Sequence, residues 1–264
     1  FSEIALFQAV FLRSIITVPP VLLMVWVTKV TLRNLAKQDI RLIWLRVGAE
    51  ICTTIAFLTA LKYMPLANVT AILQALPLAV TMAAALFLAE PIGWRRWSAI
   101  LVGFMGVLIV VRPGLDGFNV YSLSALAAII FITVREIATR KLAQEVPTIT
   151  VVLSTAIGSA VFAGIMMIGA EWHAVSTSSW LLLIGAAFAV LIATLLSVMA
   201  MRTGEIGFVS PFRYTSMLGA IGLGLFLFGE WPDQPTLAGT LIIVMTGIYT
   251  FHREQKISRG VTAA

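Results

Sequence analysis

The sequence predicts an all-α integral membrane protein made of two halves that enter the bilayer in opposite directions. Of its 264 residues, 60% are hydrophobic and 11% are charged. Soluble proteins carry roughly 25% charged residues, and the mean hydropathy here is +1.00. The apolar residues form runs long enough to cross a bilayer, and one such run returns about 140 residues later.

The repeat is visible in residues 60–90 and 200–230. They read ALKYMPLANVTAILQALPLAVTMAAALFLAE and AMRTGEIGFVSPFRYTSMLGAIGLGLFLFGE. Each stretch has a turn, an apolar span with one internal proline (Pro77 or Pro211), and an acidic end. A span of about 22 residues rises roughly 33 Å as a helix, which is about the hydrocarbon thickness of a bilayer. We therefore expect two homologous halves.

Four spans are expected in the first half, each ended by polar or helix-breaking residues. Residues 5–28 run into TKVTLRNLAKQD, and residues 42–62 end at a Tyr-Met-Pro turn. Residues 66–88 end at EPIGWR, and residues 95–112 end at RPGLDGF. None of these connections is long enough for a soluble domain.

Five spans are expected in the second half. Residues 119–139 end at RKLAQEVP, and residues 148–169 end at AEWHAVSTSS. Residues 179–200 precede MRTGE, residues 206–228 precede GEWPDQP, and residues 236–251 lead into a basic tail.

Lysine and arginine are concentrated in every second connection, and the positive-inside rule uses this asymmetry to orient the spans. One set of connections carries only Lys62 and Arg112. The other set and the tail carry Lys29, Arg33, Lys37, Arg41, Arg95, Arg96, Arg140, Lys141, Arg202, Arg253, Lys256 and Arg259. This basic set is predicted to be cytoplasmic, with the C-terminus inside. Nine spans ending inside begin outside, so we expect one further span upstream.

Ten spans with this repeat mean five plus five, with residues 1–114 holding spans 2–5 and residues 115–264 holding spans 6–10. Because five is odd, the second half is inverted. The fold class is therefore a ten-helix inverted-repeat bundle whose first helix is missing from this chain. Inverted repeats are common in secondary transporters, with the binding site near the midplane, and they also occur in channels.

One repeat, ALKYMPLANVTAILQALPLAVTMAAALFLAEPIGWRRWSAILVGFMGVLIVVRPG, resembles the EamA domain of the drug/metabolite transporter superfamily. The shared pattern is a PLA, a proline in the next span, an acidic LxE end and a glycine-spaced span. The resemblance covers nearly the whole chain, twice, and implies ten helices in two inverted halves. SPFRYTS and FGEWPD resemble a bacterial subgroup labelled as transporters of S-adenosylmethionine, riboflavin or other metabolites. This second resemblance implies that the protein is a transporter of the bacterial inner membrane.

Apart from those in the first or last two positions of a span, six charged side chains fall inside the expected spans, where charge is costly and marks candidate functional groups. They are Arg13, Arg46, Glu50, Arg135, Glu136 and Arg213. Arg46 and Arg135 lie about one turn from cytoplasmic ends, so both can snorkel to the head groups. Arg46 and Glu50 are four residues apart and can instead neutralise each other. Arg13 either contacts substrate or serves orientation and packing.

Arg213 is the leading candidate for substrate contact. It lies about 12 Å into its span by helical rise, too deep to snorkel easily. Pro211 removes one helix hydrogen bond and opens the backbone beside it. Ser210 and Tyr214 lie on roughly the same side.

A second polar lining is expected from the first half. Glu50, Thr54 and Phe57 form an i, i+4, i+7 stripe that can face the cavity, unless Glu50 only satisfies an arginine. Gln74 and Asn68 are candidate lining residues in the next span, although Asn68 can instead cap it.

The prolines and glycines of the spans have structural alternatives. Pro77 and Pro211 occupy equivalent spans and are interpreted either as hinges or as plain kinks. Small residues allow close helix packing, among them Gly103, Gly106, Gly185, Gly219 and Gly222.

No catalytic, metal or phosphate-binding motif is present, so we expect no enzyme activity, no cofactor, no metal and no nucleic-acid partner. The predicted function is secondary transport of a small amphipathic, zwitterionic or anionic metabolite through the lipid bilayer. Transport is passive or coupled to a proton or other ion, with Glu50 and Glu136 as the candidate intramembrane proton carriers. The protein is expected to be a monomer or homodimer.

Three alternatives stay open. A cationic or quaternary-ammonium metabolite or drug can bind beside aromatic rings. An integral-membrane enzyme acting on lipid head groups needs clustered Asp, His or Cys, which the sequence does not show. A channel or scaffold subunit needs a continuous polar pore, whereas the polar positions are scattered.

Overall fold

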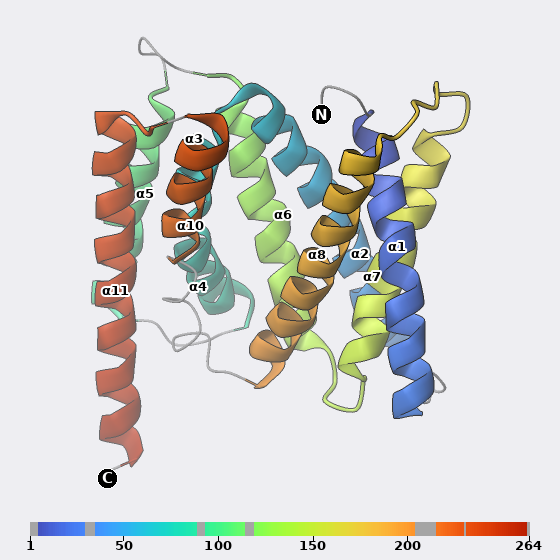
Figure 1. The fold of residues 1–264 in the computed structure, drawn as a ribbon. Helices are drawn as coiled ribbons and strands as arrows, with labels where there is room; N and C mark the ends of the chain where they lie inside the picture. The colour runs from blue at the N-terminus through green and yellow to red at the C-terminus, as the bar shows by residue number, and fades with distance from the viewer. Residues whose placement is uncertain are drawn as a thin grey trace. The chain divides into compact units, whose positions relative to one another are not determined.

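The computed structural model describes residues 5–29, 35–88, 93–113, 119–203, 215–229 and 231–262, all of them helix, turn or short connection without a strand (Figure 1). The chain divides into two compact units. Unit 1 comprises Phe1–Cys52 and Val134–Thr203, and unit 2 comprises Thr53–Thr133 and Gly204–Ala264. Each unit therefore combines a piece of the first half of the sequence with a piece of the second.

Unit 1 is a helix bundle closed by branched aliphatic side chains. It contains α1 (Leu6–Thr28), the start of α2 (Lys37–Tyr63), the end of α6 (Ser122–Lys141), α7 (Thr148–Met166) and α8 (Thr177–Thr203). Within it, α1 packs against both α7 and α8. The buried core includes Val21, Ile43, Val47, Val151, Val152, Leu191 and Val198.

Unit 2 is organised around a long helix pair. Besides the rest of α2 and α6 it contains α3 (Leu66–Leu73), α4 (Leu76–Phe87), α5 (Trp94–Val111), α10 (Thr215–Leu223), η2 (Gly224–Phe228) and α11 (Gln234–Thr262). In this unit α11 lies along α5, and α10 packs on α3 (Figure 1).

Glycines let α5 and α11 approach closely. A Cβ on Gly106 would lie 2.8 Å from the carbonyl oxygen of Gly239, and a Cβ on Gly239 would lie 2.6 Å from that of Gly106. A Cβ on Gly103 would lie 2.1 Å from Leu78 Cδ1. Close packing is thus confirmed at Gly103 and Gly106. The described residues show no neighbour within 4 Å of a Cβ at Gly185, Gly219 or Gly222.

The expected span 66–88 is interrupted rather than continuous. Helix α3 ends at Leu73, and Pro77 lies in the first turn of α4, where its missing N–H breaks no helix hydrogen bond. The backbone N–H of Gln74 donates to the carbonyl oxygens of Thr70 and Ala71, at 3.1 and 3.3 Å. The role of Pro77 as a hinge stays a prediction.

Apart from the break between α3 and α4, helices occupy most of each expected span wherever the chain is described. The largest differences are at polar ends, since α2 begins at Lys37 and α11 continues to Thr262. Hydropathy locates the apolar part of a helix but does not predict how far the helix continues into polar residues. Six of the described segments are long and apolar enough to cross a membrane, and Trp97–Val111 is a shorter apolar helix.

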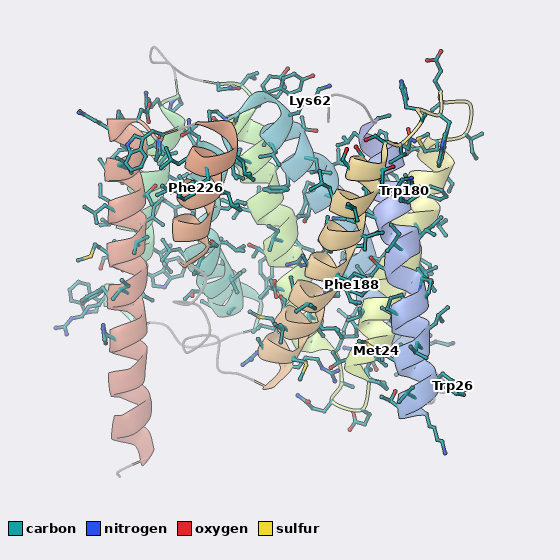
Figure 2. All side chains as sticks on the ribbon, viewed as in Figure 1. Met24, Trp26, Lys62, Trp180, Phe188 and Phe226 are labelled. Atoms are coloured by element: carbon teal, nitrogen blue, oxygen red, sulfur yellow. The ribbon has the colours of Figure 1, made fainter. Side chains whose placement is uncertain are left out.

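Large apolar side chains are exposed on the helices of each unit (Figure 2). Trp26 on α1 is 77% exposed, and Phe226 in η2 is 87% exposed. Soluble monomers rarely expose so many large apolar groups, whereas lipid tails solvate them. The fold is that of an all-α, multi-pass membrane protein. The tenth helix, the inverted relation of the halves and their boundary at residues 114 and 115 stay predictions.

Candidate functional site

Arg135 joins two carboxylates inside unit 1. Its Nη1 donates to Glu50 Oε2 at 2.6 Å, and its Nη2 donates to Glu136 Oε1 at 2.8 Å. Glu50 comes from α2, while Arg135 and Glu136 are consecutive residues of α6. The Ser197 hydroxyl lies 3.4 Å from Glu136 Oε1 and donates to it from α8. Charged side chains of α2 and α6 and a hydroxyl group of α8 therefore meet inside unit 1.

Arg46 precedes Glu50 by one helical turn of α2, and its side chain is buried inside the same unit. It is 2% exposed, its Nε donates to the Thr139 hydroxyl at 2.9 Å, and its Nη1 donates to Thr155. Snorkelling was therefore the wrong expectation for Arg46, and also for Arg135, whose guanidinium is bound to carboxylates. No ion pair joins Arg46 to Glu50, although their charges attract each other. Spacing along one helix does not show which side chains of neighbouring helices come into contact. The ion-pair partner of Glu50 is Arg135 of α6.

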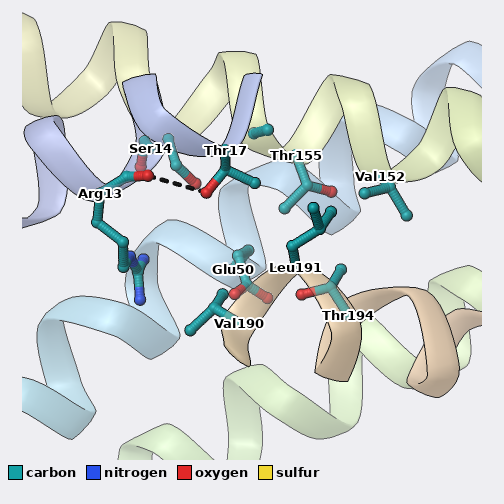
Figure 3. Close-up of a pocket in the computed structure, with 11 residues that line it drawn as sticks. Arg13, Ser14, Thr17, Glu50, Val152, Thr155, Val190, Leu191 and Thr194 are labelled. Carbon is teal, nitrogen blue, oxygen red and sulfur yellow. Dashed lines mark hydrogen bonds between the residues drawn. The ribbon is translucent and has the colours of Figure 1, made fainter. Parts of the chain in front are cut away.

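A small polar cavity adjoins Glu50 (Figure 3). Its volume is about 30 Å³, enough for roughly two water molecules. Four helices of unit 1 contribute to its wall, which consists of Arg13, Ser14, Thr17, Glu50, Val152, Thr155, Ala156, Ser159, Val190, Leu191 and Thr194. We call it the Arg13 cavity.

The structure brings three of the predicted site residues together. Arg13 and Glu50 line the Arg13 cavity, and Glu136 connects to Glu50 through Arg135. Arg13 thus lies at a polar cavity rather than serving apolar packing alone. Its contact with a substrate stays a prediction.

The remaining first-half candidates belong to unit 2. Thr54 and Phe57 are partly buried on α2, and Gln74 is 2% exposed at the end of α3. Asn68 lies inside α3, whose N-cap is Pro65, so the capping alternative was wrong for Asn68. Their role in substrate binding stays a prediction.

The second-half candidates lie outside the described residues. They are Ser210, Pro211, Arg213 and Tyr214. Their predicted roles in binding and hinge motion stay predictions.

The sequence profile of the EamA-like transporter family matches residues 1–112 and 120–251. The chain belongs to this family. The resemblance to EamA proteins found in the sequence is thereby confirmed. The EamA-like chain is 26% identical over 199 residues to the S-adenosylmethionine uptake transporter of Rickettsia conorii, and the match covers 74% of the chain and 66% of that relative. It therefore spans just under two thirds of the relative's length.

Other relatives have different printed substrates. A riboflavin transporter of Vibrio cholerae is 30% identical over 217 residues, covering 81% of the chain and 72% of the relative. A pseudopaline exporter of Pseudomonas aeruginosa is 24% identical over 216 residues, covering 81% and 76%. One solved crystal structure matches with a TM-score of 0.70 at 20% identity, covering 92% of the chain and 88% of that structure, and it shows the fold alone.

Sequence reasoning about this EamA-like chain missed the hydroxyl groups of the cavity. Ser14, Thr17, Thr155, Ser159 and Thr194 lie in apolar helices, where Ser and Thr are tolerated because they can bond to a helix carbonyl. Thr17 and Thr155 do so at 2.8 Å each. The available signal was spacing, since Thr155 and Ser159 are four residues apart on one face of α7.

Proposed function

We propose that this EamA-like chain is a secondary transporter that moves a small organic metabolite across the bacterial inner membrane. The metabolite is amphipathic and either zwitterionic or anionic. The relatives named for S-adenosylmethionine, riboflavin and pseudopaline are bacterial transporters of small molecules and support this class. The single observation that carries the proposal is the set of charged side chains held inside apolar helices beside a cavity.

The energetics of these charges favour a functional role. Removing charged groups from water is costly, and well-packed apolar residues often stabilise a fold as well as a buried ion pair does. Ionisable groups within membrane segments accordingly tend to mark substrate or ion pathways. Arg135, Glu50 and Glu136 are therefore poised to respond to a charge that enters the unit.

Transport would occur by alternating access between the two inverted repeats, 1–114 and 115–264, without nucleotide hydrolysis. Arg213, Tyr214 and Ser210 would contribute substrate contacts from the second repeat, and Pro77 and Pro211 would serve as hinges. Coupling to a proton or another ion would act through Glu50 or Glu136. The tail would lie in the cytoplasm, and the protein would act as a monomer or homodimer.

A cationic substrate is less compatible with the observed contacts. A carboxylate that binds a cation strongly must be able to leave its internal partner. Arg135 donates to both Glu50 and Glu136, so a cation would compete with a guanidinium at either site. An anionic or zwitterionic group meets no such competition at Arg13.

A thermal-shift screen of the purified protein tests binding and the predicted contact of Arg213. S-adenosylmethionine and riboflavin lead the panel, and the parent is compared with Arg213→Ala. A ligand that binds only the native state adds about 2.7 kcal/mol at a hundredfold excess over its Kd. We expect at least one compound to raise the Tm of the parent and not that of Arg213→Ala.

The matched control is Arg41→Ala, because Arg41 is an exposed arginine at the start of α2. It should respond to the same compound as the parent does. Equal shifts for the parent and Arg213→Ala would show that Arg213 does not contact the ligand.

A further inference from the structure

The charged cluster of unit 1 contains one guanidinium more than it has carboxylates. Within the described residues its members are Arg13, Arg46, Arg135, Glu50 and Glu136, three positive and two negative. Arg135 engages both carboxylates, and Arg46 is hydrogen-bonded by two hydroxyl groups. Arg46 and Arg13 therefore both lack a carboxylate in contact, and of the two only Arg13 also lacks a side-chain hydrogen bond among the described residues.

Arg13 has no counter-charge in contact. In the part of the chain that the structure describes, its side chain makes neither an ion pair nor a hydrogen bond. It is partly buried on α1 and lines the cavity, as Figure 3 shows. A guanidinium in such surroundings is stabilised by an anion that accepts from its fork of N–H groups.

Hydroxyl groups that could donate further hydrogen bonds to such an anion also line the cavity. Ser14, Ser159 and Thr194 line the Arg13 cavity from α1, α7 and α8. Among the described residues none of the three hydroxyls makes a hydrogen bond. Each can therefore donate a hydrogen bond into the cavity without losing an existing one.

The size of the cavity is compatible with a small anionic group. A volume of about 30 Å³ holds roughly two water-sized atoms, as many oxygens as a carboxylate presents. A planar guanidinium binds a carboxylate through two parallel N–H···O bonds. Glu50 shares the wall and attracts Arg13, but the guanidinium that it is bonded to is that of Arg135.

We propose that the Arg13 cavity is a subsite for the carboxylate of the transported molecule. Arg13 binds the two oxygens, and Ser14, Ser159 and Thr194 complete their hydrogen bonds. The inference rests on the proposed transport function, because it states which chemical group of the substrate enters unit 1. It assigns the substrate class as molecules with a terminal carboxylate, a group that S-adenosylmethionine carries and riboflavin lacks.

The test uses acetate as the probe, because acetate is a carboxylate with only a methyl group attached. The Tm of the detergent-purified protein is measured at increasing concentrations of sodium acetate. Two references are measured beside it: sodium chloride at the same ionic strength, and that sodium chloride solution with neutral acetamide added. We expect acetate to raise the Tm above both references. The rise should disappear in Arg13→Gln and shrink in Thr194→Val.

Two controls separate binding from folding. Arg41→Gln removes an exposed arginine of α2 that does not line the cavity, so it should keep the acetate response. Arg13→Lys keeps the positive charge but loses the fork, so it should retain part of the response. Each variant must elute from gel filtration as the parent does.

An acetate response that persists in Arg13→Gln would overturn the proposal. So would a chloride response equal to that of acetate and equally dependent on Arg13, because the cavity would then be an inorganic-anion site. Substrate counterflow by the parent together with no acetate response refutes the subsite and leaves the transport function standing. An Arg13-dependent acetate response together with no counterflow refutes the transport function and leaves the site standing.

Discussion

Arg135 is the side chain on which the charged interior of unit 1 depends. Its guanidinium is the bonded partner of Glu50 and of Glu136, whose side chain is 3% exposed. A buried charge that loses its partner keeps its desolvation cost and loses the compensating attraction. Removal of one residue would therefore leave two carboxylates without their present partner.

Arg135→Met should lower the stability by about 3–5 kcal/mol, the usual cost of breaking a buried pair from one side. Tm in detergent measures the loss. Arg41→Met is the matched control, since an exposed substitution usually changes stability by less than about 0.5 kcal/mol. The double variant Arg135→Met/Glu50→Gln should recover part of the loss, because one uncompensated carboxylate becomes neutral. Equal Tm values for Arg135→Met and Arg41→Met would contradict the role given to the pair.

The charged residues could be found from the sequence, but their partners could not. Arg13, Glu50 and Glu136 stand out because a charge in an apolar run has few innocuous explanations. The Glu50–Arg135 pair joins residues 85 positions apart, one on α2 and one on α6, and only the folded chain brings them together. Uncharged hydroxyls such as those of Ser159 and Thr194 gave no comparable signal.

The contact between α5 and α11 depends on the absence of side chains at its closest point. Gly106→Ala would place a Cβ 2.8 Å from the carbonyl oxygen of Gly239. The opposing atom is backbone and cannot turn aside, so the helices must separate. Overpacking of this kind costs about 1–3 kcal/mol, and a lowered Tm should report it.

Gly48→Ala is the control for the glycine substitution. A Cβ on Gly48 in α2 meets no described atom within 4 Å. Alanine in an exposed helix interior stabilises by about 0.5–1 kcal/mol relative to glycine. A Tm for Gly106→Ala at or above that of Gly48→Ala would contradict close packing at α5 and α11.

Asp233 connects the start of α11 to the end of α5. It caps α11 by accepting from the Thr236 N–H at 3.1 Å, and it pairs with Arg112, the left-handed C-cap of α5. Burial works to raise the pKa of Asp233, but hydrogen bonds from Thr236 and Arg112 outweigh it and hold the pKa below its usual value. The ionised carboxylate is therefore favoured in the folded state.

The stabilisation by Asp233 should be present above the unfolded pKa of about 3.9 and be lost as the pH falls through the lower folded pKa. Asparagine can still cap the helix, so Asp233→Asn isolates the charge. Because the Asp233 side chain is 48% exposed, we expect a loss below about 1 kcal/mol at neutral pH. The Tm difference from the parent should vanish in acid. A difference that grows as the pH falls would contradict this.

At the scale of the whole molecule, the sequence predicts the helices better than their association. Apolar length located the spans, because a helix must satisfy its backbone inside a bilayer. The compact units, however, are assembled from Phe1–Cys52 with Val134–Thr203 and from Thr53–Thr133 with Gly204–Ala264. Sequence repetition reports ancestry along the chain, whereas compactness depends on which helix faces fit each other.

The central claim is that this EamA-like protein is a secondary transporter of small organic metabolites. The most direct measurement is counterflow of labelled S-adenosylmethionine and riboflavin in liposomes that contain the purified protein. We predict transient, saturable accumulation of at least one label in vesicles preloaded with the same unlabelled compound, and strongly reduced accumulation with Arg135→Met. Absence of exchange, unsaturable leakage typical of a channel, or chemical conversion of the label would contradict the claim.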